Sequence, residues 1–310
     1  MADVNIGRLT TTLKWLFALG VVRNINSYLS AWAGNNFSNQ SRGWDWPKEI
    51  AVVTGGSSGF GLLFTKDLTA KGIHVVILDI NEPPAYIQSN PKVSFFKCDV
   101  TSSDEVSSVS KRVQETVGHP SILINNAGIG QSKPTLEASP AFIRKIFEVN
   151  TISHWYLIQA FLPDMLAKRK GHIITIASIA SFTAPAGIVH YAATKAAAMA
   201  LHEGLSAELR AVYKCPEIRT TSVHPGFADT PLVHAGKAEL LRAGVEVMDP
   251  QLVSDAVVKQ ILNKRGGQLI VTKTLQMLPY FRAIPAWLRQ LLLAKEERRG
   301  KVAELTGNVA

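Results

Sequence analysis

The sequence contains little cysteine: Cys98 and Cys215 are the only two among its 310 residues. They are far apart, stand in unlike contexts and lack the close spacing of metal-binding motifs. We therefore expect no disulfide framework, no zinc or other metal site and no cysteine nucleophile. Both residues are interpreted as reduced thiols of a chain that folds without disulfides.

The sequence also lacks a hydrophobic run of about 20 residues, which a membrane-spanning helix needs. The apolar run Trp15–Val22 is short and lies between Lys14 and Arg23. Its flanking charge resembles that of a signal peptide, but no convincing small-residue cleavage site follows. We expect an amphipathic helix that packs on the body of the protein or lies on a membrane surface, and a polar linker at Asn35–Arg42.

The central part of the chain has no excess of charge. The whole chain carries a net +9, but residues 48–258 are neutral overall and most of the excess lies in residues 259–301. A nucleic-acid-binding domain normally presents a basic patch on its folded body. We therefore expect no nucleic-acid partner.

A strand, a loop and a helix near the middle of the chain are the most informative stretch. Ile173–Ala177 is an apolar run typical of a buried strand, and Ser178 follows at its end. The segment Tyr191–Leu209 is rich in helix formers. Because Tyr191 and Lys195 are four residues apart, they share one face of that helix.

These three side chains suggest acid–base chemistry. A free tyrosine has a pKa near 10 and is a poor base at pH 7, and a neighbouring ammonium lowers that pKa by favouring the phenolate. Such a phenolate can remove the proton of an alcohol. A Tyr-x-x-x-Lys pair often arises by chance, so the interpretation also depends on Ser178 and on the glycine-rich loop described next.

This loop follows a predicted strand, Ile50–Thr54, and precedes a predicted helix, Leu62–Lys71. Glycine is needed where the backbone turns sharply and approaches a pyrophosphate, and the N-terminus of a helix favours the phosphate charge. The predicted dinucleotide-binding residues of the loop are Gly55, Ser57, Ser58, Gly59, Phe60 and Gly61.

An acidic residue ends the second predicted strand, His74–Asp79. A carboxylate there can accept hydrogen bonds from both ribose hydroxyls and repels a 2′-phosphate. The glycine-rich loop contains no Lys or Arg that could hold such a phosphate. Asp79 therefore favours NAD as the cofactor, and NADP is the alternative. Asp79 could also be a solvated acid at a strand end that has no contact with a cofactor.

The motifs resemble those of the classical short-chain dehydrogenase/reductase family, from about Glu49 to Lys273. Ser178, Tyr191 and Lys195 have that family's spacing, and the loop matches its Thr-Gly-x-x-x-Gly-x-Gly pattern. The resemblance implies an NAD(P)-dependent oxidoreductase that interconverts an alcohol and a carbonyl. It also implies a fourth catalytic residue, Asn150, which would bend its helix and hold a water that links Lys195 to solvent.

The resemblance implies further contacts with the cofactor. In this family Asp99 and Val100 would contact the adenine, and the Asn-Asn-Ala-Gly turn would support the sheet beside the adenosine. The loop after His224 resembles the family's Pro-Gly-x-x-x-Thr, which contacts the nicotinamide carboxamide. The residues concerned, with Tyr191 and Lys195, are Asp99, Val100, Asn126, Ala127, Gly128, Pro225, Gly226, Phe227 and Thr230.

Alternating strand and helix patterns predict an α/β fold: a Rossmann-like, doubly wound parallel sheet with helices on both faces. The predicted single domain is 48–273, with apolar extensions at 1–47 and 274–310. Further predicted strands are Val93–Cys98, Ser121–Asn125, Thr220–Val223 and Gln268–Thr272, and further predicted helices are Ala141–Met165 and Asp249–Asn263.

Two apolar segments suggest a lipophilic substrate and a membrane surface. Pro231–Val247 resembles the family's mobile substrate lid. Leu275–Ala294 is apolar and aromatic with interspersed Arg and Pro, and the basic cluster Lys295–Lys301 follows it. This segment suits a lipid interface or docking on the body or a second subunit. The pattern resembles the branch that oxidises retinoids, steroids and other lipophilic alcohols.

That resemblance implies peripheral association with the cytoplasmic side of the endoplasmic reticulum or with lipid droplets, and a homo-oligomer. Two other functions remain open from the sequence. One is an NADPH-dependent ketone reductase of a biosynthetic pathway, against which Asp79 argues. The other is a non-catalytic, NAD-binding, membrane-associated protein, against which the four intact catalytic residues argue.

Overall fold

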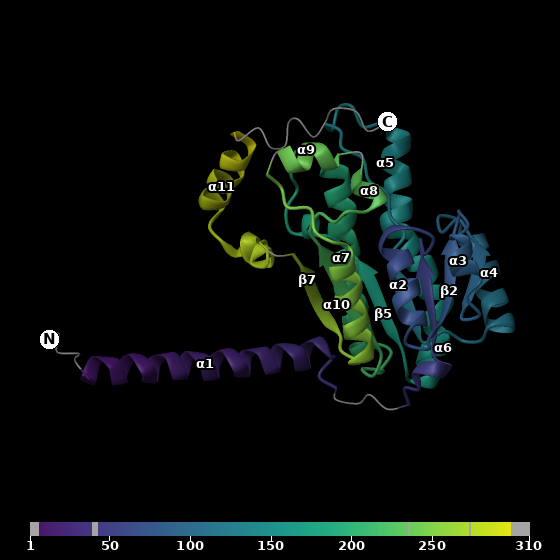
Figure 1. The fold of residues 1–310 in the computed structure, drawn as a ribbon, viewed down its shortest axis with the longest axis horizontal. Coiled ribbons are helices and arrows are strands. Elements are labelled where there is room, and N and C mark those ends of the chain that lie inside the picture. The colour runs from purple at the N-terminus through teal and green to yellow at the C-terminus, as the bar shows by residue number, and fades with distance from the viewer. Residues whose placement is uncertain (1–5, 39–42, 235, 243, 273, 299–310) are drawn as a thin grey trace.

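The computed structural model describes residues 6–38, 43–234, 236–242, 244–272 and 274–298. Its centre is a seven-stranded, parallel sheet with the strand order β3-β2-β1-β4-β5-β6-β7 (Figure 1). The order reverses between β1 and β4, which is the point where such sheets bind their ligands. The predicted Rossmann-like, doubly wound parallel sheet is confirmed.

The strands agree with the predicted ones because most are short, buried, apolar runs that a parallel sheet covered on both faces requires. The predicted bounds of β1 (Ile50–Thr54) and β2 (His74–Asp79) are those observed. The remaining strands differ from prediction by one or two residues: β3 (Val93–Lys97), β4 (Ile122–Asn125), β5 (His172–Ile176), β6 (Arg219–Pro225) and β7 (Gly267–Val271).

Helices cover both faces of the sheet. One face packs against α2 (Gly59–Thr69) and α10 (Gln251–Leu262), and the other against α4 (Ser103–Thr116), α6 (Ser153–Lys168) and α7 (Val189–Ala211). The shorter elements are η1 (Trp46–Lys48), α3 (Ala85–Gln88), α5 (Pro140–Phe147), η2 (Glu148–Ile152), η3 (Ile179–Ser181), α8 (Pro231–His234), α9 (Lys237–Arg242) and η4 (Leu278–Ala283).

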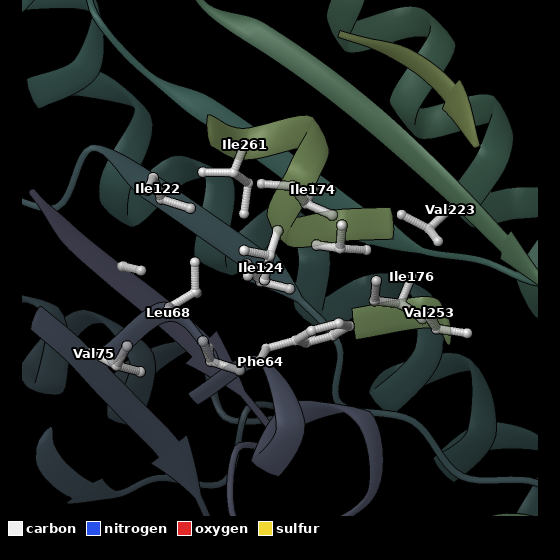
Figure 2. Close-up of a cluster of buried hydrophobic side chains, with 14 of the residues drawn as sticks. Phe64, Leu68, Val75, Ile122, Ile124, Ile174, Ile176, Val223, Val253 and Ile261 are labelled. Carbon is white, nitrogen blue, oxygen red and sulfur yellow. The ribbon is translucent and has the colours of Figure 1, made fainter. Parts of the chain in front are cut away.

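The hydrophobic core lies in two layers, one on each side of the sheet. Figure 2 shows the layer in which Phe64 and Leu68 of α2 and Val253 of α10 pack on strand residues such as Ile124 and Ile174. All five side chains are fully buried. Burial of one such side chain contributes about 1.5–3 kcal/mol, so this layer fixes α2, and with it the glycine-rich loop, against the sheet.

The predicted single helix Ala141–Met165 is interrupted. Helix α5 ends at Phe147, a wider π-type turn, η2, follows, and α6 continues from Ser153. The Ser153 hydroxyl donates to the Val149 carbonyl at 2.7 Å, which competes with the regular helical pattern. The interruption lies at Asn150, where the resemblance implies a bend.

The first helix, α1 (Ile6–Gly34), projects away from the body (Figure 1). Residues 9–32 are all exposed, so the expected alternative in which this helix packs on the body is wrong for them. The helix is also less amphipathic than expected, because neighbours such as Leu16 and Phe17 place apolar side chains on different faces.

The junction after α1 is tied to the body, in contrast to the expected linker. Asn36 is buried; its amide donates to the Ile218 carbonyl at 3.0 Å and accepts from Ser206 and Arg210, each at 2.8 Å. The Asn35 side chain accepts from Gly266 N at 2.7 Å. Residues 39–42 of the expected linker lie outside the described residues.

The C-terminal extension contains η4 and α11 (Ala286–Arg298), which lies apart from the sheet beyond β7 (Figure 1). Tyr280 and Trp287 are exposed. Part of the predicted basic cluster, residues 299–301, lies outside the described residues. Among the described helices, none has both the length and the hydropathy that crossing a membrane requires.

Candidate active site

The glycine-rich loop is a tight turn that only glycine permits at several positions. Gly55 and Gly59 have positive φ values of 63° and 51°, which side chains disfavour. A Cβ atom on Gly61 would collide with the Gly55 carbonyl group. The loop therefore brings its backbone close to the first turn of α2 with no side chain in between.

The N-terminus of α2 fits a dinucleotide phosphate. Ser58 is the N-cap residue, but its side chain makes no capping hydrogen bond, and the first helical bond runs from Leu62 N to the Ser58 carbonyl. The amides of the first turn are therefore directed out of the helix, where the positive end of the helix dipole favours an anion. This is the fit that a pyrophosphate requires.

Asp79 stands beside this loop at the end of β2. Its carboxylate accepts from Ser57 N and from Asn81 N, both at 3.0 Å. These bonds fix the carboxylate between the glycine-rich loop and the next turn. The geometry agrees with a carboxylate that faces a ribose, although each oxygen already accepts one backbone hydrogen bond.

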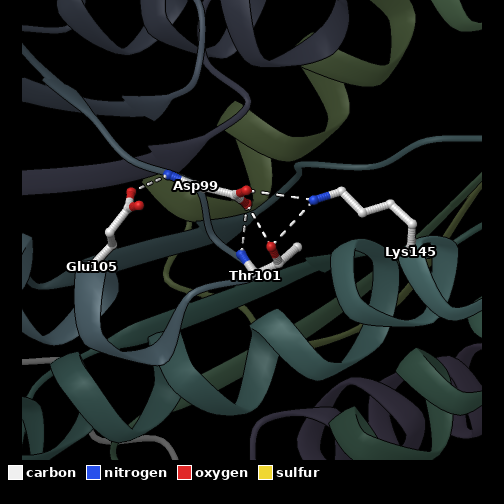
Figure 3. Close-up of polar contacts among 4 residues, drawn as sticks. All are labelled: Asp99, Thr101, Glu105 and Lys145. Carbon is white, nitrogen blue, oxygen red and sulfur yellow. Dashed lines mark hydrogen bonds and ion pairs between the residues drawn. The ribbon is translucent and has the colours of Figure 1, made fainter.

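Asp99, at the end of β3, lies in a local polar cluster (Figure 3). Its carboxylate accepts from the amide and hydroxyl of Thr101, at 3.0 and 2.7 Å, and pairs with Lys145 at 3.4 Å. Burial raises the pKa of Asp99, but these hydrogen bonds and the Lys145 charge outweigh it and hold the pKa below its usual value. Val100 is buried next to it.

The Asn-Asn-Ala-Gly turn after β4 is hydrogen bonded to the point where β1 passes into the glycine-rich loop. Thr54 Oγ1 accepts from Asn126 N at 2.9 Å and from Ala127 N at 3.0 Å. The Asn126 side chain donates to the carbonyls of Thr54 and Gly55, at 2.8 and 3.1 Å. Thr54 was not among the predicted site residues, although it directly precedes the glycines.

Ser178, Tyr191 and Lys195 lie together where β5 ends and α7 begins. The Ser178 hydroxyl lies within reach of the Tyr191 phenol, close enough for hydrogen bonding to lower the pKa of the phenol. Lys195 is buried and lies with its Nζ atom 5.7 Å from the centre of the Tyr191 ring. The same ammonium donates to the Ile176 carbonyl at 2.8 Å, so the strand end holds it in place.

The pKa of Tyr191 differs from the expectation that Lys195 lowers it. Burial raises this pKa above its usual value, and only the hydrogen bond with Ser178 opposes that effect. Burial also lowers the pKa of Lys195 to about 8. Both shifts have the same cause, because a low-dielectric site disfavours the charged form of either group.

Asn150 lies behind the site, in the π-type turn η2. It is fully buried; its Oδ1 accepts from Ile129 N at 2.8 Å, and its Nδ2 donates to the Ile129 carbonyl at 2.9 Å and to Thr194 at 3.1 Å. A Cβ atom on Gly128 would lie 3.4 Å from Asn150 Oδ1 and 3.6 Å from Lys195 Nζ. Asn150 thus holds the turn that flanks Lys195, and its proposed water stays a prediction.

The loop after β6 closes the other side of the site. Gly226 N donates to the Val271 carbonyl at 2.9 Å, and the Phe227 carbonyl accepts from Met248 N at 2.8 Å. Thr230 is buried and reaches the glycine-rich loop, since a Cβ atom on Gly59 would lie 3.8 Å from Thr230 Cβ. The predicted phosphate and nicotinamide contacts are therefore neighbours in space.

The predicted lid begins near Gly130, which Tyr191 also approaches. A Cβ atom on Gly130 would lie 3.3 Å from Leu232 Cδ1 and 3.4 Å from the Tyr191 ring. Leu232 and Leu241 are about half exposed, whereas Leu240 is buried. Ala235, which falls within the range of the predicted lid, lies outside the described residues. One apolar side chain of the predicted lid, Leu232, thus lies close to Gly130 beside the predicted site.

His224 is a site residue that the sequence analysis missed. Its Nδ1 donates to the Ser178 carbonyl at 3.0 Å, so this nitrogen carries the proton. Its Nε2 then accepts from Ser222 at 3.2 Å and from Gln268 at 3.3 Å. The sequence feature that could have identified His224 is its position directly before Pro225-Gly226, near the end of the strand that pairs with β5.

Comparison with known proteins identifies the family. Residues 49–240 match the family model described as short chain dehydrogenase. The chain is 41% identical over 212 residues to dehydrogenase RED2 of Cochliobolus heterostrophus, across 67% of this chain and 80% of the relative. The chain belongs to the short-chain dehydrogenase family. It is therefore an oxidoreductase that acts on CH–OH groups with a nicotinamide dinucleotide.

More distant relatives of this short-chain dehydrogenase include retinol dehydrogenase 10 of Homo sapiens, 30% identical over 245 residues, and estradiol 17-beta-dehydrogenase 11 of Rattus norvegicus, 31% identical over 221 residues. Each match covers 69% of this chain and 71% of the relative. The aldohexose dehydrogenase of Thermoplasma acidophilum has a similar structure (TM-score 0.62, 26% identity, 72% of this chain and 92% of that chain). 4-Hydroxyisoleucine dehydrogenase complexed with NADH shares the fold (TM-score 0.65, 23% identity, 72% and 96%).

Four buried histidines of this short-chain dehydrogenase lead to a prediction about acid stability. Burial lowers the pKa to about 3 for His154 and His172 and to about 4 for His202 and His224. The unfolded chain binds protons at these groups near pH 6.5 and the folded chain does not, so their contribution to stability is complete above pH 6.5 and is lost as the pH falls toward 4.

We therefore expect the free energy of unfolding, measured by urea titration from pH 7.5 to 4.5, to stay level above pH 6.5 and to fall below it by about 1.4 kcal/mol per pH unit for each such histidine. His202→Gln removes one titrating group from the buried set and should reduce the slope by close to one proton. An unchanged slope in that variant would contradict the assignment.

Proposed function

We propose that this short-chain dehydrogenase oxidises a lipophilic secondary or allylic alcohol with NAD, with Tyr191 as the acid–base residue. The observation that carries the proposal is the assembly of Ser178, Tyr191 and Lys195 at the carboxyl ends of the strands, with the apolar Leu232 and the tyrosine ring both beside Gly130. The names of the retinol and estradiol dehydrogenase relatives support an apolar substrate.

Each residue has a role that follows from its contacts. Tyr191 takes the hydroxyl proton, and Ser178, hydrogen bonded to it, holds the substrate oxygen at the same place and stabilises the charge that develops there. Lys195 is fixed by Ile176 with its Nζ atom 5.7 Å from the centre of the Tyr191 ring, and its proposed role is to hold the nicotinamide ribose and to favour the phenolate against the burial that raises the Tyr191 pKa. Asn150 holds the turn around Lys195. The bound nicotinamide would supply the acceptor for the carbinol hydrogen.

Tyr191→Phe removes the proton acceptor and leaves the ring packing unchanged. We expect turnover to fall roughly hundredfold or more, since positioned acid–base groups contribute about that much, while the NAD dissociation constant stays within about twofold. Steady-state assays with retinol and estradiol, together with calorimetric titration of NAD, measure the two effects.

Tyr86→Phe is a matched control, because Tyr86 is exposed on α3. It should retain the wild-type rate. Loss of NAD binding together with turnover in Tyr191→Phe would refute the role assigned to the phenol, and retained turnover would refute it as well.

The preference for NAD rests on Asp79, whose carboxylate is held beside the glycine-rich loop by Ser57 N and Asn81 N. Asp79→Ser should weaken NAD binding and improve NADP binding, because the 2′-phosphate no longer meets a negative charge. A shift of about tenfold in the ratio of kcat/KM values corresponds to about 1.4 kcal/mol.

Asp104→Ala removes a carboxylate from the first turn of α4 and serves as the control. A wild-type enzyme that prefers NADP would contradict the inference from Asp79. It would favour NADPH-dependent ketone reduction, the second candidate. The raised pKa of Tyr191 gives that candidate some support, since a protonated phenol is the form that donates to a carbonyl oxygen.

We further propose that α1 lies on an anionic membrane or lipid-droplet surface on the cytoplasmic side. The apolar residues Trp15, Phe17 and Val22 are exposed by 65%, 75% and 63%, and Lys14 and Arg23 flank them. Exposed apolar side chains beside basic ones bind to the headgroup region of anionic lipids. The expected homo-oligomer stays a prediction.

The double variant Phe17→Glu/Val22→Glu should abolish co-flotation with vesicles of phosphatidylcholine and phosphatidylserine and leave turnover in detergent unchanged. The control Tyr86→Glu/Leu136→Glu places the same charge at exposed positions of the body and should still float. Equal flotation of both double variants would refute the assignment to α1.

A further inference from the structure

The turn that follows Ser178 is contacted by a residue a hundred positions later in the chain. Arg282, in η4 of the C-terminal extension, donates from Nε to the Phe182 carbonyl at 3.0 Å and from Nη2 to the Ser181 carbonyl at 3.4 Å. The guanidinium thus holds two consecutive carbonyl groups at the end of η3. Both residues of the turn are buried.

These peptides also determine the geometry of Ser178 itself. The Ser178 hydroxyl accepts from Ala180 N at 3.1 Å, and the Ser178 carbonyl accepts from Ser181 N at 3.0 Å. A displacement of the turn would move both amides. The orientation of the Ser178 side chain toward Tyr191 therefore depends on where the turn is held.

Within the described part of the chain, two further side-chain hydrogen bonds and a ring contact attach the turn to the core. His224 donates to the Ser178 carbonyl, and its ring packs on Phe182 with 4.6 Å between ring centres. The Ser181 hydroxyl donates to the Lys195 carbonyl at 2.9 Å. These contacts fix the start and the inner side of the turn, whereas the carbonyls at its end are held by Arg282.

We propose that Arg282 is a positioning residue for Ser178, and that η4 is thereby part of the catalytic site. This inference rests on the catalytic role proposed above for Ser178. Arg282 itself is exposed at the surface, and it acts through the turn rather than on the substrate. A charge-assisted, two-pronged donor suits this task, because it fixes both the position and the angle of the peptides it contacts.

The experiment compares Arg282→Gln, Arg282→Lys and Arg289→Gln in the full-length chain. Arg289→Gln removes the same charge from the same extension, on α11, and is the matched control. Hydrogen exchange followed by mass spectrometry on the peptide that covers residues 178–190 reports the turn without any substrate. We expect faster exchange there in Arg282→Gln, an intermediate rate in Arg282→Lys and the wild-type rate in Arg289→Gln.

Turnover of retinol or estradiol with NAD is the second readout. Misplacement of a catalytic group lowers kcat, so we expect a fall of roughly threefold to thirtyfold in Arg282→Gln, with the NAD dissociation constant and the melting temperature close to those of Arg289→Gln. Arg282→Lys, which keeps one donor, should recover part of the loss. In the Ser178→Ala background Arg282→Gln should cause no further fall.

Unchanged exchange in Arg282→Gln would overturn the proposal. Faster exchange with an unchanged kcat would also overturn it, because the contact would then be only structural. An additive loss of kcat in the Ser178→Ala background would overturn it as well. Failure of the proposed function has a different signature: full activity of Ser178→Ala, or no turnover of alcohols by the wild-type enzyme.

Discussion

Parallel pairing of all seven strands is the constraint on which the rest of the structure depends. It places the carboxyl ends of β1, β2, β4, β5 and β6 at one edge of the sheet. The residues that follow those ends then become neighbours, although more than a hundred positions separate the first from the last. Because the strand order reverses between β1 and β4, the loops that follow these two strands run to opposite sides and leave a crevice between them. The glycine-rich loop, which follows β1, lies at this crevice.

Much of this arrangement could be predicted because it has local signals. Strands such as Ile50–Thr54 are uniformly apolar, since both of their faces are covered, and the glycines of the loop are demanded by backbone geometry at single positions. Tyr191 and Lys195 share a helix face through spacing alone. Parallel pairing then places the loop, Asp79 and Ser178 at the same end of the sheet, which could be inferred without coordinates, whereas the order of the strands could not.

What could not be predicted depends on contacts between distant segments or on burial. The pKa of Tyr191 is raised because the fold encloses it, and no spacing along the sequence reports that enclosure. Asn36 lies in a stretch whose composition suggests a linker, yet three partners from distant parts of the chain bury it. The same holds for His224 and Arg282, whose partners are backbone carbonyls that carry no mark in the sequence.

The two extensions are attached at opposite edges of the sheet, which separates their roles. Asn35 and Asn36 bind Gly266 and Ile218, which precede β7 and β6, so α1 leaves the body at the amino ends of the strands. Arg282 binds the turn after β5, at the carboxyl ends. The contacts of the α1 junction therefore lie at the end of the sheet away from Ser178, whereas η4 contacts the turn that follows Ser178.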